Sequence, residues 1–341
     1  MKIALDAAAG DSGIAPNIEG AVHAANSHGI SVILVGPGAD IRAQLSARGI
    51  SGGDARFEIV EAREVISMGE DASVACRSKP HCSIMAAAEL VASGRASAMV
   101  SAGNSGATLV AALWHLKRLP GVLRPAIAVP IPTVRGLSVL LDGGANTECK
   151  PWHLLQFATM GVIYAKTVLK VADPLVGILS AGEEEVKGNE LVREALPLLK
   201  CGGLRFHGPI EGRDLAAGTV DVVVCDGFVG NIAAKAVEGT AAAIFSLLKA
   251  AVMKDWPSKL GGTLLKGALA DIRRKMSYEE YGGAPLLGVN GTVVIAPGRS
   301  GPKAIANALG VAKALAAADV NGTIRKTLEE MKVNLEVSNS K

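Results

Sequence analysis

Short apolar runs alternate along the chain with stretches of helical periodicity. The runs predict buried strands at 2–6, 31–35, 57–60, 96–100, 126–132, 137–141, 175–179, 220–224 and 292–296. The periodic stretches predict helices at 17–27, 39–48, 82–93, 109–116, 150–169, 232–253 and 259–276, with further helices from 303 onward. This strand–helix rhythm is typical of an α/β protein with a mostly parallel sheet and right-handed crossovers.

The run at 96–100 ends in a loop of small residues that continues into a helical pattern. Gly103 and Gly106 allow the backbone to approach a ligand closely, and Asn104 and Ser105 lie beside them. The first N–H groups of the following helix point into the same space, at the positive end of the helix dipole. This corner therefore suits a phosphate-sized anion, although an ordinary strand–helix connection has the same pattern.

Three further runs end in the same way. Small or polar residues follow the strands within 139–146, 176–184 and 222–231. The carboxyl ends of strands in an open α/β sheet line one crevice, where ligands bind. We therefore expect these corners to converge on one ligand, with the weakly periodic stretch 67–81 forming a loop over the crevice.

Composition narrows the class of protein. The 341 residues allow one large α/β domain or two modest ones, and only 3% are aromatic, so the core is expected to be aliphatic. A net charge of +3 without a basic stripe argues against a nucleic-acid partner. Five cysteines without a CxxC pair indicate a reduced, cytoplasmic compartment, and six scattered histidines predict no metal site. No apolar run reaches the ~18–20 residues of a membrane-spanning helix.

Several polar residues at these strand ends are candidates for chemistry, each with a structural alternative. Lys187 follows an acidic run and precedes a glycine, so it either holds phosphate as a point charge or is a solvated surface lysine. Asn231 either caps the helix expected from 232 or also presents its amide to a reacting carbonyl. Lys150 either faces the crevice or begins a helix. Asp226 more often holds a loop through its backbone hydrogen bonds than takes part in a reaction.

The stretch 256–269 has a basic amphipathic character. Leu260, Leu264 and Leu265 fall on one helical face, with Lys259 and Lys266 nearby. Such a helix can rest on an anionic bilayer, pack against a second copy of the chain, or make plain core contacts.

Eight blocks of sequence, in order, resemble the PlsX-type phosphate acyltransferases of bacterial phospholipid synthesis. They lie at 3–11, 100–107, 124–126, 140–146, 149–161, 182–188, 226–231 and 282–289. They include Val-Ser-Ala-Gly-Asn-Ser-Gly-Ala at 100–107, Leu-Leu-Asp-Gly-Gly-Ala-Asn at 140–146 and Asp-Gly-Phe-Val-Gly-Asn at 226–231.

The resemblance implies that a fatty acyl thioester of acyl carrier protein reacts with inorganic phosphate to give acyl phosphate, without a cofactor. It implies a Rossmann-like three-layer α/β/α fold similar to isopropylmalate dehydrogenase, as a single domain over 1–341, in a homodimer. Residues 232–281 are expected to protrude as a helical pair that faces the dimer partner or a membrane. The protein is expected at the inner membrane face, where a membrane glycerol-3-phosphate acyltransferase uses the acyl phosphate.

The chain departs from the family pattern in three places. Ala9 replaces a glycine, so a ligand that approaches the backbone there would meet a methyl group. Pro297 replaces the usual histidine, and 81–83 read His-Cys-Ser where Asp-Ser-Ser is usual. We therefore expect no histidine base.

The chemistry fits the remaining residues, because phosphate is already nucleophilic and a thiolate is a tolerable leaving group. We expect Lys187 and Asn231 to be catalytic, the first holding phosphate and the second the thioester carbonyl or its oxyanion. The expected substrate-binding residues are Asn104, Ser105, Gly106, Lys150, Asp226, Gly227 and Gly230. The alternatives are a phosphate acetyl- or butyryltransferase that uses coenzyme A thioesters, or an inactive acyl-carrier or membrane scaffold. A dehydrogenase is not supported, because the sequence contains no GxGxxG fingerprint with an acidic residue after it.

Overall fold

The computed structural model describes residues 1–338, and its strands lie in two sheets. The strands are β1 (Lys2–Asp6), β2 (Ser31–Gly36), β3 (Phe57–Glu61), β4 (Ala98–Ser101), β5 (Ala126–Ile127), β6 (Val129–Thr133), β7 (Gly136–Leu141), β8 (Val176–Leu179), β9 (Phe206–Ile210), β10 (Val222–Val224), β11 (Ala284–Leu287) and β12 (Thr292–Ile295). The helices are α1 (Ile14–His28), α2 (Gly38–Ser46), α3 (Ala72–Ser78), α4 (Ser83–Ala92), α5 (Ser105–His115), α6 (Pro151–Thr167), α7 (Glu190–Cys201), α8 (Gly212–Ala217), α9 (Gly227–Met253), α10 (Trp256–Met276), α11 (Tyr278–Tyr281), α12 (Pro302–Ala317) and α13 (Val320–Ser338).

The first lobe is built on a seven-stranded sheet with the order β3-β2-β1-β4-β12-β11-β5. Six of these strands run in the same direction, and β11 runs antiparallel to both of its neighbours, β12 and β5. Alternate side chains of β1 point to opposite faces: Ile3 and Leu5 pack into the core that contains α1 and α12, and Ala4 packs with α4 and α5. Helices therefore cover both faces of this sheet.

The second lobe is built on a five-stranded sheet with the order β6-β7-β10-β8-β9, parallel except for β6. Leu141 and Val224 face α6 and α7, whereas Leu140 and Val223 face α8 and the foot of α9. The three-layer α/β class is therefore confirmed, but the strands are divided between two sheets. Whether both lobes fold as one domain stays a prediction.

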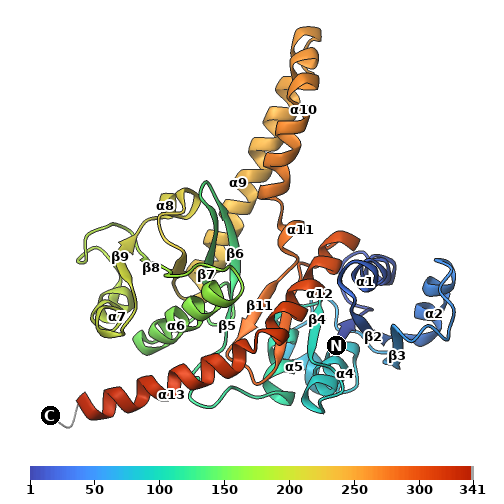
Figure 1. Cartoon of the computed structure of the whole chain (residues 1–341), viewed down its shortest axis with the longest axis horizontal. Coiled ribbons are helices and arrows are strands. Elements are labelled where there is room, and N and C mark those ends of the chain that lie inside the picture. Colours follow the sequence, from blue (N-terminus) through green and yellow to red (C-terminus); the bar gives the residue numbers. More distant parts are fainter. Residues whose placement is uncertain (339–341) are drawn as a thin grey trace.

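Long elements connect the two lobes (Figure 1). The chain crosses between the sheets where β5 gives way to β6, and α13 packs against α6. Helices α9 and α10 form an antiparallel pair that projects away from both lobes, as expected (Figure 1). Its first helix starts from the second sheet, and the chain returns through α11 to the first.

Two local expectations are wrong. The loop expected at 67–81 contains α3, because the Asp71 side chain accepts a hydrogen bond from the Val74 N–H and caps a helix whose Ala75 and Cys76 are buried. The long helix expected from 232 begins at Gly227 instead, because Asp226 is its N-cap. Asn231 therefore lies inside α9 and does not cap it.

Candidate active site

The corner after β4 is fixed from below by a buried carboxyl group. Ser101 Oγ accepts a hydrogen bond from the Gly103 N–H at 3.0 Å and donates one to Asp6 Oδ2 at 2.8 Å. Asp6 ends β1, and burial raises the pKa of its carboxyl to about 6, partly offset by the nearby Ser83 and Ser101 hydroxyls. These contacts settle the path of the chain through Gly103.

The side chain of Asn104 is fully engaged in holding this corner. Its Oδ1 accepts from the Ala107 N–H at 3.0 Å and caps α5, while its Nδ2 donates to the carbonyl oxygens of Ser67, Met68 and Glu70. The groups left for a ligand are backbone donors: the N–H groups of Ser105 and Gly106 have no hydrogen-bond partner within residues 1–338. The geometry of an anion corner is thus present, with the carboxamide of Asn104 supporting it.

The departure at Ala9 is accommodated inside the protein. Its methyl group is buried against Gly103, and its carbonyl oxygen accepts a hydrogen bond from Asn17 Nδ2 at 2.7 Å. Ala9 is also absent from the positive-φ residues of the described chain, so no strain arises there.

Asp142 organises the corner after β7. Its Oδ1 accepts from the N–H groups of Ile127, Gly144 and Ala145 at 2.9, 3.2 and 3.1 Å. Its Oδ2 accepts from the N–H and Nδ2 of Asn146 at 2.7 and 2.9 Å. Burial raises the pKa of this carboxyl, and the backbone donors counteract the rise. Since Ile127 ends a strand of the other sheet, Asp142 also joins the two lobes.

The first turn of α9 packs directly on this corner. The Gly227 N–H donates to the carbonyl oxygen of Asn146 at 2.7 Å, and a methyl group at Gly230 would overlap the carbonyl oxygen of Asp142. Asp226 Oδ1 accepts from the Val229 N–H at 2.9 Å. These contacts show that Asp226, Gly227 and Gly230 have a structural role. Their contact with substrate stays a prediction.

Asn231 lies one turn further along α9 and is exposed. Its side chain lies against Gly144, where a Cβ would sit 3.6 Å from the Asn231 carboxamide carbon. Within the described chain no hydrogen bond engages its carboxamide, in contrast to Asn104. The amide is therefore available to a ligand at the corner after β7.

Two turns beyond Asn231, α9 meets the first lobe. Glu238 forms an ion pair with Arg299, which lies in the loop between β12 and α12. The neighbouring Gly298 carbonyl oxygen accepts from the Asp11 N–H at 2.8 Å, in the loop after β1. Residues seven apart share one face of a helix, so the face of α9 that carries Asn231 and Glu238 lies between the strand ends of both lobes.

The two predicted lysines lie at the rim of the second lobe. Lys187 follows β8, the neighbour of β10, but its side chain is 57% exposed and its Nζ pairs with Glu184 Oε1 at 3.1 Å. No hydrogen bond or ion pair within residues 1–338 joins it to Asn104 or Asn231. Lys150 is the exposed N-cap of α6, and its N–H donates to His153 Nδ1 at 3.1 Å.

Arg124 and Arg299 are cations that spacing alone did not single out. Burial lowers the pKa of His153, and the charges of Arg124 and Lys150 lower it further, which places both cations near the start of α6. Burial and the carboxylates of Asp142 and Asp226 raise the pKa of the Cys149 thiol, beside them, to about 12, so this thiol stays protonated at neutral pH and is a weak nucleophile. Arg124 belongs to one of the sequence blocks that carry the family resemblance, and that block could have identified it as a candidate site residue.

The projecting pair α9–α10 exposes an unusual amount of apolar surface. In α10 no residue is buried, and in α9 only Gly227 and Gly230 are. Large exposed side chains on the pair are Phe228, Ile232, Ile244, Leu247, Leu248, Met253, Trp256, Leu260, Leu264, Leu265 and Ile272. Contrary to expectation, α9 is long and apolar enough to cross a membrane, judged by length and composition alone.

Comparisons with known proteins show the family. The model of a family described as fatty acid synthesis protein matches residues 1–323. The phosphate acyltransferase of Pelotomaculum thermopropionicum is 48% identical over 333 residues, which cover 98% of this chain and 96% of its own. That of Pelobacter propionicus is 48% identical over 334 residues, covering 98% and 95%.

Solved structures share the fold at low sequence identity. A phosphotransacetylase from Streptococcus pyogenes matches with a TM-score of 0.60 and 19% identity, covering 93% of this chain and 94% of its own. The EutD phosphotransacetylase from Staphylococcus aureus matches with a TM-score of 0.55 and 16% identity, with the same coverage of both chains. The family match and the close relatives decide the identity: the chain belongs to the fatty acid synthesis protein family, that of the PlsX-type phosphate acyltransferases, and is an acyltransferase.

Proposed function

We propose that this protein transfers a fatty acyl group from acyl carrier protein to inorganic phosphate. The observation that carries the proposal is the position of α9: its exposed Asn231 amide lies at the corner after β7, and its Glu238 reaches the strand ends of the other lobe. This face is where a small anion and an acyl thioester would meet. The name of the relatives, phosphate acyltransferase, fits an anionic acceptor of this kind.

The reaction needs orientation and charge stabilisation more than proton transfer. A phosphate oxygen attacks the thioester carbonyl carbon, a C–O bond forms, the C–S bond breaks, and the departing thiolate takes a proton from solvent. The free N–H groups of Ser105 and Gly106, with Lys187, hold phosphate. The Asn231 amide donates to the oxyanion that develops on the carbonyl. Lys150 supplies positive charge at the rim.

The acyl chain requires an apolar path beside this amide. Phe228 and Ile232 flank Asn231 at the foot of α9 and are 60% and 54% exposed. Burying the exposed part of either side chain against a fatty chain would stabilise the complex by roughly 1–2 kcal/mol. An acetyl group would leave both exposed, so the site favours a long acyl chain.

A turnover assay distinguishes the candidate donors. The purified protein is incubated with phosphate and either palmitoyl-acyl carrier protein, palmitoyl coenzyme A or acetyl coenzyme A. Acyl phosphate is trapped as its hydroxamate and the released thiol is counted. We expect one hydroxamate and one thiol per turnover with the carrier-protein thioester. Turnover with acetyl coenzyme A alone would favour a phosphotransacetylase, and no turnover with any thioester would favour a scaffold.

The projecting pair α9–α10 supports the remaining parts of the proposal. Its exposed apolar side chains would be buried by a partner protein or by lipid. The basic residues Arg273, Arg274 and Lys275 at the end of α10 suit an anionic surface. We place the protein in the cytoplasm as a homodimer that contacts the inner membrane face. A membrane glycerol-3-phosphate acyltransferase would there consume the acyl phosphate for phospholipid synthesis.

A further inference from the structure

A segment of the first lobe crosses the β4–α5 corner and is tied to it by one side chain. We call residues 65–71, between β3 and α3, the strap. Asn104 Nδ2 donates to the strap carbonyl oxygens of Ser67, Met68 and Glu70 at 3.4, 3.2 and 3.0 Å. Because Asn104 Oδ1 also accepts from the Ala107 N–H, this side chain couples the strap to the first turn of α5.

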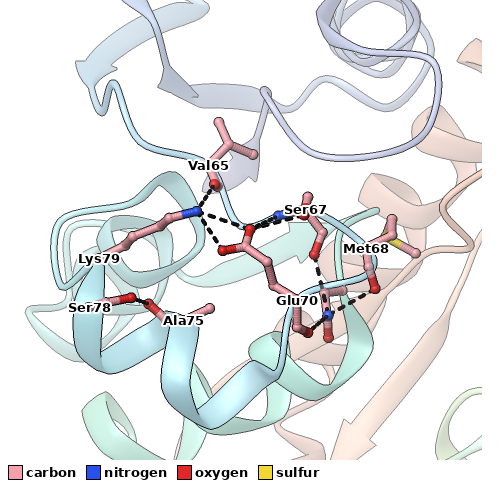
Figure 2. Close-up of polar contacts among 8 residues, drawn as sticks. Val65, Ser67, Met68, Glu70, Ala75, Ser78 and Lys79 are labelled. Carbon is pink, nitrogen blue, oxygen red and sulfur yellow. Dashed lines mark hydrogen bonds and ion pairs between the residues drawn. The ribbon is translucent and has the colours of Figure 1, made fainter.

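The other side of the strap is held by an ion pair (Figure 2). Glu70 Oε2 accepts from the N–H and Oγ of Ser67 at 2.7 and 3.0 Å. Lys79 Nζ donates to Glu70 Oε1 and Oε2 at 2.7 and 3.0 Å and to the Val65 carbonyl oxygen at 3.1 Å. Lys79 directly follows α3, so the pair connects both ends of the strap to that helix.

The strap also borders the side of the lobe that faces α9. A Cβ at Gly298 would lie 2.8 Å from Met68 Cε, so the strap reaches the loop after β12. Arg299, the next residue, pairs with Glu238 of α9. The strap therefore lies along the edge where the proposed reaction takes place.

We propose that Glu70 and Lys79 are positioning residues for phosphate. They hold the strap, the strap carbonyls hold the Asn104 carboxamide, and that carboxamide orients the first turn of α5 with its free Ser105 and Gly106 N–H groups. Neither charged group touches substrate. The inference rests on the proposed function, because it assigns this corner to phosphate.

The charge state of the pair suits a fixed support. The hydrogen bond from Lys79, with those from Ser67, lowers the pKa of Glu70 to about 2. The Glu70 carboxylate therefore stays ionised throughout the neutral range and can hold the strap in place over that range.

The test compares two carboxylates of the same lobe. Glu70→Gln removes the carboxylate that holds the strap. Glu58→Gln is the control: it removes a carboxylate that is equally exposed (33%) but is paired with Lys2 and Arg95 at the amino end of the sheet. We expect Glu70→Gln and Lys79→Met to raise the KM for phosphate about tenfold with a smaller change in kcat. Lys79→Arg should recover most of the loss, and Glu58→Gln should behave as the wild type.

Hydrogen exchange provides a readout that needs no turnover. The Ala107 amide should exchange about tenfold faster in Lys79→Met than in the wild type, because its acceptor Asn104 Oδ1 is no longer fixed. An unchanged Ala107 exchange rate would overturn the inference, as would an unchanged phosphate KM in an active enzyme. If the wild type shows no turnover, the proposed function fails, while the exchange rate still decides whether the pair positions α5.

Discussion

At the scale of the residue, the corners at the strand ends contain side chains that support the backbone and side chains that remain free. Asn104 and Asp142 use all or nearly all of their hydrogen-bonding capacity within the protein. Asn231 has the same carboxamide as Asn104 but is exposed and is not engaged by the described residues. A polar group without a partner at a crevice is the better candidate for contact with the reacting atoms.

Asn231→Ala should lower kcat about 100-fold, the usual cost of removing one oxyanion donor. The free energy of unfolding should stay within ~0.5 kcal/mol of the wild-type value, because the side chain is exposed. Acyl phosphate formation and urea unfolding are the two measurements. Lys249→Ala, at an exposed position far along the same helix, is the control. A wild-type kcat would remove Asn231 from the mechanism.

Asp6 makes the stability depend on pH. Burial raises the pKa of its carboxyl from 3.8 to about 6, so the folded state binds this proton more tightly than the unfolded chain. The resulting stabilisation is complete below about pH 4 and is lost as the pH rises through about 6. Relative to Asp6→Asn, the wild-type free energy of unfolding should fall by roughly 2–3 kcal/mol between pH 4 and 7. Urea unfolding across this range checks it, and a constant difference would show that the carboxyl does not titrate in this window.

At the scale of the element, the sequence pattern predicted those helices and strands whose formation depends on neighbouring residues. The order of strand, glycine turn and helix within 98–115 was predicted because apolar run, small loop and periodicity are contiguous, although the helix begins at Ser105 and not at 109. The start of α9 was missed because both Asp226 and Asn231 are good N-caps, and packing on the β7 corner selected Asp226. The strap contacts of Asn104 join residues at least 34 positions apart, which no local pattern reveals.

Two glycines of α9 distinguish the effect of tertiary packing on stability from the effect of helix propensity. Gly230→Ala should destabilise the protein by about 1–3 kcal/mol or more, because the added methyl group overlaps the Asp142 carbonyl oxygen. Gly239→Ala, where a Cβ meets nothing within 4 Å, should stabilise it by about 0.5–1 kcal/mol. Urea midpoints of the two variants should therefore shift in opposite directions. Equal shifts would mean that α9 does not rest on this corner.

The apolar face of α10 should mediate contact with lipid. Leu264 is 81% exposed, and Leu264→Glu should weaken binding to anionic vesicles more than tenfold, because the apolar side chain that would enter the lipid is replaced by a charge. Thr263→Glu adds the same charge at the neighbouring exposed position and is the control. Vesicle flotation measures binding, and sedimentation measures dimerisation in parallel. Intact flotation with a loss of the dimer would assign this face to the partner subunit instead.

At the scale of the whole molecule, the sequence predicted an α/β protein but not its division into two sheets. The apolar stretch expected as one strand at 126–132 is divided: β5 lies at the edge of the first sheet and β6 at the edge of the second. Apolar residues stand on both sides of this crossing, at 126–129 and 131, so the apolar pattern does not mark the division. Contacts between the lobes, such as Glu238–Arg299, join residues far apart in the sequence, and only the folded chain brings them together.

That contact is expected to matter for geometry more than for stability. Glu238 and Arg299 are 34% and 57% exposed, and exposed ion pairs contribute about 0–1 kcal/mol. Glu238→Gln should therefore change the free energy of unfolding by less than ~1 kcal/mol, yet lower kcat/KM for the carrier-protein thioester about tenfold, because the two sets of strand ends lose a fixed separation. Raising the salt concentration should bring the wild type closer to the variant. Asp271→Asn removes an ion pair with Arg274 on α10, away from the crevice, and should leave kcat/KM unchanged. A wild-type kcat/KM in Glu238→Gln would mean that α9 keeps its place between the lobes through its packing on Asp142 alone.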